Sequence, residues 1–494
     1  MLKILSSDQV RDWDAFTISN EPIASIDLME RACRAFVVWF AERFNASRRV
    51  GVVCGTGNNG GDGLGIARLL REWGYSVNVW VVRGQSAGSA DFNTNLGRLE
   101  SAIPVVEVRQ PGDPMVFDEC DIVIDGLFGS GLSRPAGGIY AYAIEQINGA
   151  ETTRIAIDIP SGLLIDRPST GAIVRAHYTV TFQLPKLAFY LPGCYAYVGE
   201  WHVVDIGLAN QFLKSVSTTT YQIQRKDVRR IRKRRSKFGH KGDYGRAVLV
   251  AGGYGKMGAA VLGARAALRS GLGLLTMHVP LCGYAIVQTA VPEAMARVDA
   301  GEYAITELPA IEADAVGIGP GIGTSEATAK AFRRFLETHK KPMVIDADAL
   351  NILSANSGMM ELVPPLSLLT PHPREFERLA GSWPDDFARL DLVREFARRH
   401  NVIVILKGAY STIASPDGNV YFNPTGNPGM ATGGSGDVLT GILTGILAQG
   451  YDPLEAAIMG VYLHGRAGDV AMADKGTEGL IASDLVEYLP QAFR

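Results

Sequence analysis

The residues of this chain that could do chemistry are concentrated in two glycine-rich loops. The first reads GTGNNGGDG over residues 55–63, and the second reads NPGMATGGSGD over residues 427–437. Each loop leads directly into a helical pattern, so its backbone N–H groups and the start of the helix can hold an anion such as phosphate. The amide and carboxylate side chains can also orient a polar ligand or coordinate a cation. We therefore expect two separate sites.

The first loop has matching chemistry at two later strand ends. One apolar run ends at Asp125, and another ends at Asp158, with Ser161 close behind. A single aspartate in such a place is usually a turn or helix-cap residue, but neighbouring parallel strands share one crevice at their carboxyl ends. Three acidic loops together therefore favour a binding site. The strand after the glycine loop ends at Arg83 instead of the acidic residue that grips an NAD ribose, which argues against a standard dehydrogenase.

The second loop has the features of a phosphoryl-transfer site. Its glycines allow a tight turn whose N–H groups point at phosphate oxygens, and the dipole of the following helix favours negative charge there. Asp437 stands where it can take a proton from a hydroxyl that attacks a terminal phosphoryl group. Upstream, residues 407–411 (KGAYS) follow a strand-like run and offer a cation and backbone donors to a nucleotide. His372 is held between two prolines, which favours contact with a ligand.

Alternating strand-like and helical patterns must position these loops. Such alternation predicts βαβ units and hence parallel sheets covered by helices. The strand-like runs are residues 49–54, 77–82, 121–124, 154–157, 246–251, 315–318, 343–345 and 402–406. The rhythm lapses over residues 211–220, and we predict a domain boundary between residues 210 and 225.

The composition agrees with two globular domains. The chain has 494 residues, of which 47% are hydrophobic and 20% charged, and its net charge is −3. This charge offers no general attraction to nucleic acid or to anionic membranes, so an anionic ligand needs a local site. The five cysteines form no C-x-x-C pair, and the sequence shows neither a signal-peptide core nor a long uncharged apolar run. We expect a cytoplasmic protein.

Residues 229–235 (RRIRKRR) hold six basic side chains in seven positions. Two interpretations remain open for this basic run. It could be an arm that binds nucleic acid or phosphate, or a solvated linker or helix face entering the second domain. The rest of the chain is not basic, which favours the linker.

Through NNGGDG, DGLFGSGLSRP and DIPSGL, residues 1–215 resemble the NAD(P)HX epimerase family. The resemblance implies a Rossmann-like three-layer α/β/α domain and a potassium ion held by Asn59, Asp125 and Ser161, whose oxygen atoms suit a hard cation. It also implies a set of residues that contact the hydrated dinucleotide. These are Asn58, Asn59, Gly60, Gly61, Asp62, Gly129, Ser130, Gly131, Leu132, Ser133, Arg134, Pro135 and Asp158.

Epimerisation needs proton transfer, because the two hydrates interconvert through an opened or iminium-like ring. Asp158 is the candidate acid/base. The alternative is that Asp158 only hydrogen-bonds the substrate while spontaneous ring chemistry does the rest.

Through GGYGKMGAA, GIGPGIG, DADAL, TPHPREFERLA, LKGAYS and NPGMATGGSGDVLTGI, residues 225–494 resemble the ADP- or ATP-dependent NAD(P)HX dehydratases, which are ribokinase-like α/β proteins. The resemblance implies that Asp437 is the catalytic base and contacts the substrate. The implied substrate contacts are Gly321, His372, Pro373, Arg374, Glu375, Phe376, Glu377 and Arg378. The implied nucleotide contacts are Lys407, Gly408, Ala409, Tyr410, Ser411, Asn427, Pro428, Gly429, Met430, Ala431, Thr432, Gly433, Gly434, Ser435 and Gly436.

The two resemblances together predict a bifunctional repair enzyme for hydrated NADH and NADPH. Its second domain would phosphorylate the ring hydroxyl of the S epimer, turning a poor leaving group into phosphate, and the first domain would supply that epimer from the R form. Phosphoryl transfer implies Mg²⁺. ADP is the favoured donor, and ATP stays open. We expect only small-molecule partners, with no nucleic acid and no membrane, and a homo-oligomer.

One alternative function shares the second loop. A ribokinase-like small-molecule kinase would use the same GGSGD glycines and aspartate, with the first domain as a non-catalytic binding module. The NNGGDG loop argues against it.

Overall fold

The computed structural model describes residues 1–84, 87–99 and 103–494, which form two compact units. The first unit comprises Lys3–Thr218 and Asp385–Phe387, and the second comprises Met1–Leu2, Thr219–Pro384 and Ala388–Arg494. Each unit has its own sheet and its own apolar core. Among the described helices, none is both long enough and apolar enough to cross a lipid bilayer.

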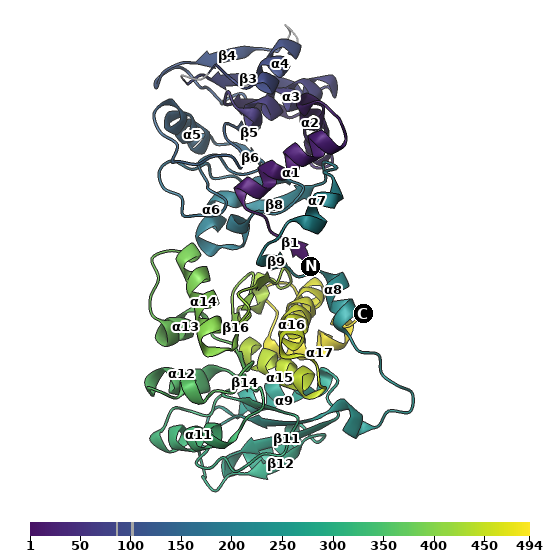
Figure 1. Cartoon of the computed structure of the whole chain (residues 1–494), viewed down its shortest axis with the longest axis vertical. Coiled ribbons are helices and arrows are strands. Elements are labelled where there is room, and N and C mark those ends of the chain that lie inside the picture. The colour runs from purple at the N-terminus through teal and green to yellow at the C-terminus, as the bar shows by residue number, and fades with distance from the viewer. Residues whose placement is uncertain (85–86, 100–102) are drawn as a thin grey trace. The chain divides into compact units, whose positions relative to one another are not determined.

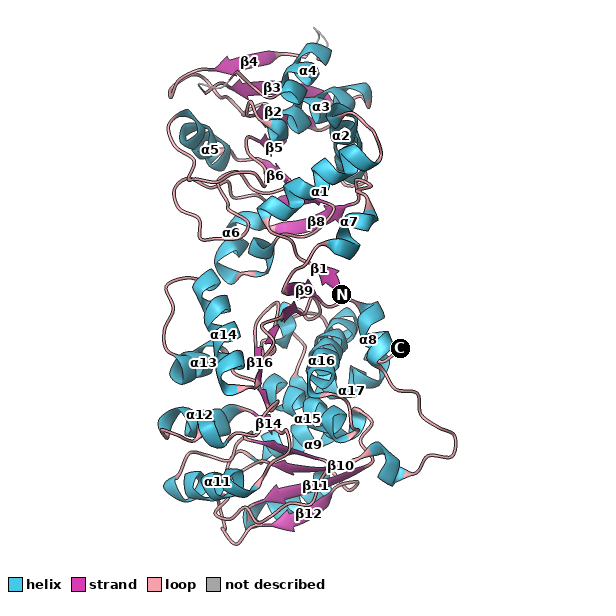
Figure 2. Ribbon diagram, viewed as in Figure 1, coloured by secondary structure: helices cyan, strands magenta, loops and turns pink. Residues whose placement is uncertain are grey.

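A parallel sheet is the centre of the first unit (Figure 2). Among the described residues it has seven strands in the order β4-β3-β2-β5-β6-β7-β8, and all neighbours are parallel. The central strands are rich in valine and isoleucine and are buried, as strands between two helix layers must be. The strands are β2 (Arg49–Cys54), β3 (Ser76–Val82), β4 (Val105–Val108), β5 (Ile122–Gly126), β6 (Thr153–Ile157), β7 (Tyr178–Phe182) and β8 (Glu200–Val204).

Helices cover both faces of this sheet (Figure 1). On one face α2 and α3 bury Phe36, Phe40 and Leu64, and on the other α5 buries Ile144 and Ile147. The helices are α1 (Ser7–Asn20), α2 (Ser25–Ala41), α3 (Asn58–Glu72), α4 (Ala90–Arg98), α5 (Ile139–Gly149), α6 (Tyr195–Val198) and α7 (Asn210–Ser215). This arrangement confirms the predicted Rossmann-like three-layer domain.

The second unit is built on a larger mixed sheet. Its order among the described residues is β1-β9-β18-β17-β16-β15-β14-β13-β10-β11-β12; β16, β17 and β18 pair antiparallel, and the strands from β12 to β16 are parallel. The strands are β1 (Leu2–Lys3), β9 (Thr220–Gln222), β10 (Arg246–Val250), β11 (Leu274–Val279), β12 (Met295–Val298), β13 (Ala315–Ile318), β14 (Val344–Ile345), β15 (Leu368–Leu369), β16 (Ile403–Leu406), β17 (Thr412–Ala414) and β18 (Val420–Phe422).

Two layers of helices also enclose the second sheet. Figure 1 shows α11 to α14 on one side and α9, α15, α16 and α17 on the other, in agreement with the predicted α/β class. The helices are α8 (Arg225–Ile231), α9 (Met257–Arg269), α10 (Tyr284–Ala290), α11 (Glu326–Thr338), α12 (Ala347–Ala355), α13 (Pro373–Ala380), α14 (Asp386–His400), α15 (Ser435–Ala448), α16 (Pro453–Lys475) and α17 (Ala482–Ala492).

Glycines let α15 pack against α9 backbone to backbone. A β-carbon on Gly441 would lie 2.1 Å from the carbonyl oxygen of Gly263, and one on Gly445 would lie 2.2 Å from the hydroxyl of Ser270. Ile442, Leu443 and Ile446 in this part of α15 are apolar and buried. This close approach fixes the start of α15, which carries Asp437, above the carboxyl ends of the parallel strands.

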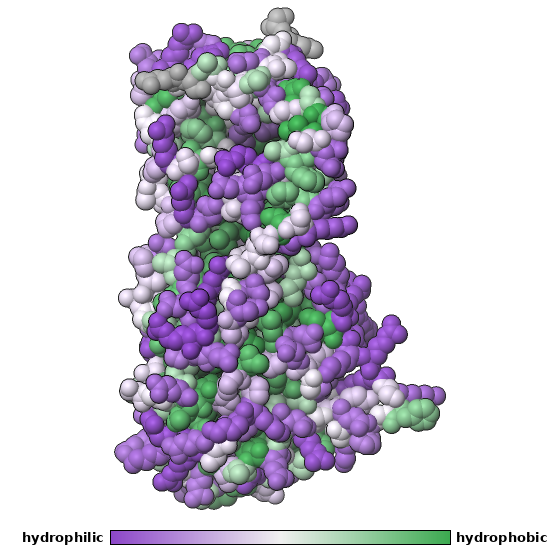
Figure 3. Space-filling model, in the orientation of Figure 1, coloured by the Kyte–Doolittle hydropathy of each residue, from purple (hydrophilic) through white to green (hydrophobic). Residues whose placement is uncertain are grey.

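The basic run is exposed and comprises the end of α8 and the chain that follows it, in agreement with the favoured interpretation, and three of its side chains also contact the ends of other helices. Arg232 donates to the carbonyl of Phe493 at the end of α17 (2.6 Å), and Lys233 donates to that of Gly450 just after α15 (2.6 Å). Arg235 donates to the carbonyl of Gly271, just after α9. Cations at these positions neutralise the negative ends of three helix dipoles. In Figure 1 the chain beyond the run forms a loop that projects from the helices, and Figure 3 shows hydrophilic side chains over most of the visible face.

Candidate functional site

A cavity of about 840 Å³ lies in the first unit where the strand order reverses between β2 and β5. Ligands of open α/β sheets bind at this switch point. The lining residues are Ser7, Asp8, Arg11, Asp14, Gly57, Asn58, Asn59, Asp62, Ser89, Leu127, Phe128, Gly129, Ser130, Gly131, Leu132, Ser133, Arg134, Asp158, Asp166, Arg167 and Phe182. Three of the substrate contacts predicted for this unit do not line the cavity: Gly60, Gly61 and Pro135. Another hollow of about 700 Å³, at the amino ends of the strands, holds none of the predicted residues.

The start of α3 depends on glycine. A β-carbon on Gly60 would lie 1.8 Å from the carbonyl oxygen of Gly55, so a side chain here would push the helix away from the end of β2. With glycine, the first turn of α3 reaches the cavity and brings Asn58, Asn59 and Asp62 to its wall. The NNGGDG pattern therefore both satisfies a packing requirement and forms part of the cavity wall.

Of the three predicted potassium ligands, Asn59 lines this cavity, and Asp125 and Ser161 are hydrogen-bonded to each other. Ser161 donates its hydroxyl to Asp125 (2.6 Å) and its backbone N–H to the other carboxylate oxygen (2.8 Å). The Ser161 hydroxyl also lies 3.2 Å from the carbonyl of Phe128, and the side-chain oxygen of Asn59 lies beside Gly129. The side-chain nitrogen of Asn59 is buried without a hydrogen-bond partner among the described residues.

Asp125 is fully buried, and the described residues supply no cation to it. Burial raises the pKa of Asp125 to about 6, although hydrogen bonds from Ser161 and Leu127 act in the opposite direction. A buried carboxylate among hydroxyl, carbonyl and amide oxygens fits a hard cation such as K⁺, which would compensate its charge.

Asp158 lies at the end of β6 in a strained conformation, with φ of +63° in the left-handed region. Its carboxylate accepts from the ammonium of Lys186 (3.0 Å) and the hydroxyl of Thr181 (3.1 Å). Burial works against ionisation, but the charge and hydrogen bond of Lys186, with help from Phe182 and Thr181, leave the pKa of Asp158 below its usual value. The cavity wall therefore presents an ionised carboxylate.

Asp62 has the opposite character. Burial, and then the charges of Asp158 and Asp14, raise the pKa of Asp62 well above its usual value. In the described residues its carboxyl group has no cationic partner. Two aspartates of one cavity thus differ in protonation, which is how two carboxyl groups take acid and base roles.

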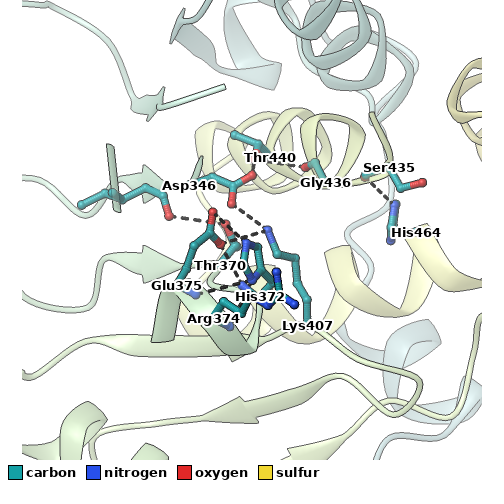
Figure 4. A network of polar contacts seen from close by, with 11 residues as sticks. Asp346, Thr370, His372, Arg374, Glu375, Lys407, Ser435, Gly436, Thr440 and His464 are labelled. Carbon is teal, nitrogen blue, oxygen red and sulfur yellow. Dashed lines mark hydrogen bonds and ion pairs between the residues drawn. The ribbon is translucent and has the colours of Figure 1, made fainter. Parts of the chain in front are cut away.

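In the second unit, Lys407 is the centre of a polar network at the carboxyl ends of β14, β15 and β16 (Figure 4). Its ammonium lies 2.9 Å from one oxygen of Asp346 and 3.8 Å from Glu375. The hydroxyl of Thr440 on α15 donates to the other oxygen of Asp346 (2.6 Å). Burial opposes the charge of Lys407, but Asp346 and Glu375 outweigh it and raise its pKa. This keeps a fixed cation next to the glycine loop, within 3.5 Å of a β-carbon built on Gly436.

His372 is the N-cap of α13. The ring Nδ1 of His372 accepts from the backbone N–H groups of Arg374 (3.1 Å) and Glu375 (3.4 Å). The backbone N–H of His372 donates to the Glu375 carboxylate (2.8 Å). Burial lowers the pKa of His372, so its Nε2 carries the ring proton and can donate. Phe376, in contrast, is buried in the core against Phe396 and cannot offer its ring to a ligand.

Asp437 lies in the first turn of α15, half-buried. Burial and then the charge of Asp346 raise its pKa to about 6, against the opposing effect of Lys407. The loop before it is held by His464, whose Nε2 lies 2.9 Å from the carbonyl of Ser435. Burial lowers the pKa of His464 to about 4, so the ring is neutral and donates. Asn427 is also engaged, because its amide caps Gly429 and contacts Asp469.

Sequence reasoning missed Lys186, Thr440 and His464. Lys186 lies 28 positions after Asp158 and only the pairing of β6 with β7 brings the two together. Thr440 and His464 lie in helices with many buried apolar residues, so the sequence pattern indicates ordinary core positions for both. A polar residue placed in an otherwise buried stretch is the one signal that could have identified them.

Known proteins resemble this chain over nearly its whole length. Residues 25–188 match the family described as YjeF-related protein N-terminus, and residues 247–491 match NAD(P)H-hydrate dehydratase. The bifunctional NAD(P)H-hydrate repair enzyme Nnr of Moorella thermoacetica is 36% identical over 513 residues, 99% of this chain and 96% of that protein. The enzyme of the same name from Thermofilum pendens is 36% identical over 511 residues, 100% of this chain and 96% of that protein.

A solved structure resembles the second unit. The ADP/ATP-dependent NAD(P)H-hydrate dehydratase from Bacillus subtilis, co-crystallized with ATP/Mg²⁺, is 31% identical and superposes with a TM-score of 0.50. The match covers 56% of this chain and 99% of that one.

Proposed function

The chain belongs to the family of bifunctional NAD(P)H-hydrate repair enzymes, and from this premise we propose which of its residues carry out the two reactions. The enzyme epimerises the hydrates of NADH and NADPH and dehydrates them with the help of a nucleotide. In the first unit, the observation that carries the assignment is that the glycine loop lines a cavity where the strand order reverses between β2 and β5. In the second unit, it is that Lys407, paired with Asp346, lies next to the glycine loop that leads to Asp437.

We propose that the cavity of the first unit is the epimerase site and that Asp158 is a proton-transfer group. Asp158 is ionised and faces the cavity, so it can accept the proton of the ring hydroxyl. Lys186 holds the carboxylate in place and keeps it charged. The polar loop from Gly129 to Arg134 and the amides of Asn58 and Asn59 offer hydrogen bonds to the dinucleotide.

Asn59, Asp125 and Ser161 are the residues that we propose to hold K⁺ in the first unit. When bound, K⁺ would supply a positive charge that compensates the buried carboxylate of Asp125. The chain's own part is to align its oxygen atoms, and the fully buried carboxylate of Asp125, to which the described residues supply no cation, supports this assignment. We expect KCl to raise the unfolding temperature of the wild-type chain more than choline chloride does at equal ionic strength. Asp125→Asn should remove that difference; an equal difference in the variant would contradict the assignment.

We propose that the second unit binds the nucleotide along residues 407–411 and 427–436 and the hydrated ring near Gly321 and His372. Asp437 takes the proton of the ring hydroxyl, whose oxygen then attacks the terminal phosphoryl group. The bond from that phosphorus to the nucleotide breaks, and the electron pair of the ring nitrogen later expels the phosphate. Loss of a proton from the adjacent ring carbon restores the double bond of NAD(P)H.

Mg²⁺ fits this site as a companion of the nucleotide, because it is bound mainly through substrate phosphates with one or two carboxylates. Lys407 gives the negative phosphates a fixed charge, and the N-terminus of α15 adds its dipole. We propose ADP as the donor, with ATP as the second candidate, and the S hydrate as the form that is dehydrated.

A mixture of R and S hydrates of NADH, given ADP or ATP and Mg²⁺, tests the whole proposal. We expect absorbance of NADH to appear with one of the nucleotides and to reach the full amount of both epimers. Asp437→Asn should stop NADH formation and leave epimerisation intact. No NADH with either nucleotide would sink the proposal, and a phosphorylated product without NADH would indicate a kinase.

The predicted homo-oligomer has one structural support. At the edge of the second sheet, α10 and β12 expose Tyr284, Ile286 and Met295, which are between 44% and 53% accessible. Exposed apolar side chains beside an unpaired strand edge favour association with another copy. We propose that copies meet here. Light scattering should show that Met295→Lys lowers the oligomer mass, whereas an unchanged mass would place the interface elsewhere.

A further inference from the structure

Asp14, on the N-terminal helix, faces the epimerase cavity although it lies outside the matched family region of residues 25–188. Ser7, Arg11 and Asp14 follow the spacing of one helix face, and all three line the cavity. The adjacent face of α1 is anchored. Trp13 is buried and donates its indole N–H to the carbonyl of Ala209 (2.9 Å).

The hydroxyl of Thr17, one turn further along α1, accepts from the N–H of Ala209 (3.0 Å). The ring of Trp13 also stacks on Phe212, with 6.0 Å between the ring centroids. Because these two contacts fix the rotation of α1, the carboxyl group of Asp14 is held toward the cavity and is not a mobile surface charge.

The surroundings of Asp14 differ from those of Asp158. Asp158 is paired with Lys186 and hydrogen-bonded, whereas the described residues give the carboxyl group of Asp14 neither a hydrogen bond nor an ion pair. Burial and then the charge of Asp158 raise the pKa of Asp14 to about 6, while Lys186 opposes this. An acid or base works best when its pKa lies near the operating pH, which fits Asp14 better than the strongly shifted Asp62.

We propose that Asp14 is the second catalytic group of the epimerase and exchanges a proton with the ring nitrogen of the hydrate while Asp158 exchanges one with the ring hydroxyl. This inference rests on the proposed location of the epimerase site.

In the forward step Asp158 accepts the hydroxyl proton and Asp14 gives its proton to the ring nitrogen. The bond between that nitrogen and the hydroxyl-bearing carbon breaks, its electron pair goes to the nitrogen, and the carbon becomes an aldehyde. After rotation about the neighbouring carbon–carbon bond, the nitrogen attacks the other face of the aldehyde. Asp158 returns its proton to the oxygen and Asp14 recovers its own from the nitrogen. Both groups end as they began, and no oxidant, reductant or external water is consumed.

The pH dependence follows from these roles. The reactive form has Asp14 protonated and Asp158 ionised, so the epimerase rate should fall as the pH rises through about 6 and Asp14 loses its proton. Other charged groups also face this space and do not fill the same role. They are Asp8, Arg11, Asp62, Arg134, Asp166 and Arg167 on the cavity wall, and Lys186 behind Asp158.

Asp14→Asn tests the proposal, with Asp12→Asn on the exposed side of the same helix as the matched control. The assay follows conversion of one purified hydrate into the other without nucleotide, so the dehydratase does not contribute. We expect Asp14→Asn to lower kcat by about 100-fold or more, with KM nearly unchanged and without the fall in rate above pH 6. Asp14→Glu should recover part of the rate. Asp12→Asn should match the wild type, and all variants should keep dehydratase activity and the wild-type unfolding temperature.

Asp158→Asn separates the two possible failures. If Asp158→Asn abolishes epimerisation while Asp14→Asn keeps the wild-type rate and pH profile, the role of Asp14 is wrong and the site stands. If both variants remain fully active, the location of the epimerase site is wrong as well. A loss in Asp14→Asn that Asp14→Glu does not relieve, with an unchanged pH profile, indicates a structural role and also overturns the proposal.

Discussion

At the scale of single residues, each site places a lysine against a buried aspartate. Lys186 lies 3.0 Å from Asp158, and Lys407 lies 2.9 Å from Asp346. The two pairs serve different ends. In the first unit the carboxylate of the pair faces the cavity that we propose as the epimerase site. In the second unit the pair lies beside the glycine loop, and the proposed base is a third residue, Asp437. Removing one partner of such a pair leaves an uncompensated buried charge.

Asp437→Asn should separate stability from activity. Burial raises the folded-state pKa of Asp437 to about 6, from about 4 in an unfolded chain. The folded state therefore holds the proton more tightly, and wild-type stability falls as the pH rises from 4 to 6 and stays lower above it. Asparagine does not ionise, so the variant should be more stable than the wild type at pH 8 by roughly 2 kcal/mol at most. Urea unfolding at pH 4 and pH 8 checks this; a variant less stable than the wild type at pH 8 would contradict the stated cause.

The site could be predicted at the residue scale where a motif is contiguous. Asn59, Asp62 and Asp437 lie in glycine-rich loops, and the sequence alone predicts that such loops bind anions or polar ligands. Lys186 and Asp14 could not be found in this way, because neither lies in a glycine-rich loop. Only the folded sheet and the orientation of α1 bring them to the cavity.

At the scale of elements, the strands were the most predictable part of the fold. The β-branched runs at residues 49–54 and 315–318 are strands with the same bounds in the structure. The short strands β17 and β18 were not predicted. Each has three residues, which is too few to show the alternation of apolar and polar residues that indicates a strand. The basic run between α8 and β10 was open to two interpretations. Its side chains cap the ends of three helices, and this could not be predicted without knowing where those helices end.

Gly441→Ala should destabilise the second unit. A β-carbon at this position overlaps the backbone of α9 at Gly263, which would force the helices apart at a cost of about 1–3 kcal/mol. Dehydratase activity should fall with the displaced Asp437, and epimerase activity should persist. The control is Gly258→Ala in α9, where a β-carbon meets nothing within 4 Å and should stabilise the helix slightly. Equal unfolding temperatures for the two variants would contradict the packing argument.

Lys233→Ala should show what the basic run contributes. Loss of the hydrogen bond to Gly450 and of the charge at the end of α15 should lower the unfolding free energy by about 1 kcal/mol. Arg234→Ala is the matched neighbour, since Arg234 is exposed and makes none of these capping contacts, and its effect should stay within about 0.5 kcal/mol. Denaturant titration compares them. If both changes lower the unfolding free energy equally, the capping contact of Lys233 does not add stability and the run is only a solvated linker.

At the scale of the whole molecule, each proposed active site is formed by residues of one unit. The cavity residues of the first unit lie between Ser7 and Phe182, and the polar network of the second lies between Asp346 and His464. Neither reaction therefore needs side chains from the other unit. The two activities are linked in one chain through their substrate, because one unit produces the epimer that the other consumes.

A mixture of Asp158→Asn chains with Asp437→Asn chains tests this independence. Each variant keeps one activity, and their mixture should convert all of a mixed-epimer sample to NADH, as the wild type does. NADH absorbance measures the final amount. If conversion stops at the amount of S hydrate initially present, apart from slow spontaneous epimerisation, the substrate must pass between units of the same chain.

The basic run has a practical consequence for handling the protein. Residues 232–235 are exposed and offer trypsin several adjacent cleavage sites. A cut there would divide the chain after α8, yet β9 on the N-terminal fragment remains paired with β18 on the other, through Thr220–Gln222 and Val420–Phe422. Brief digestion should therefore give two bands on a denaturing gel and one species on a native gel. The nicked enzyme would be a two-chain assembly that still repairs its substrate, held together by a strand rather than by a peptide bond.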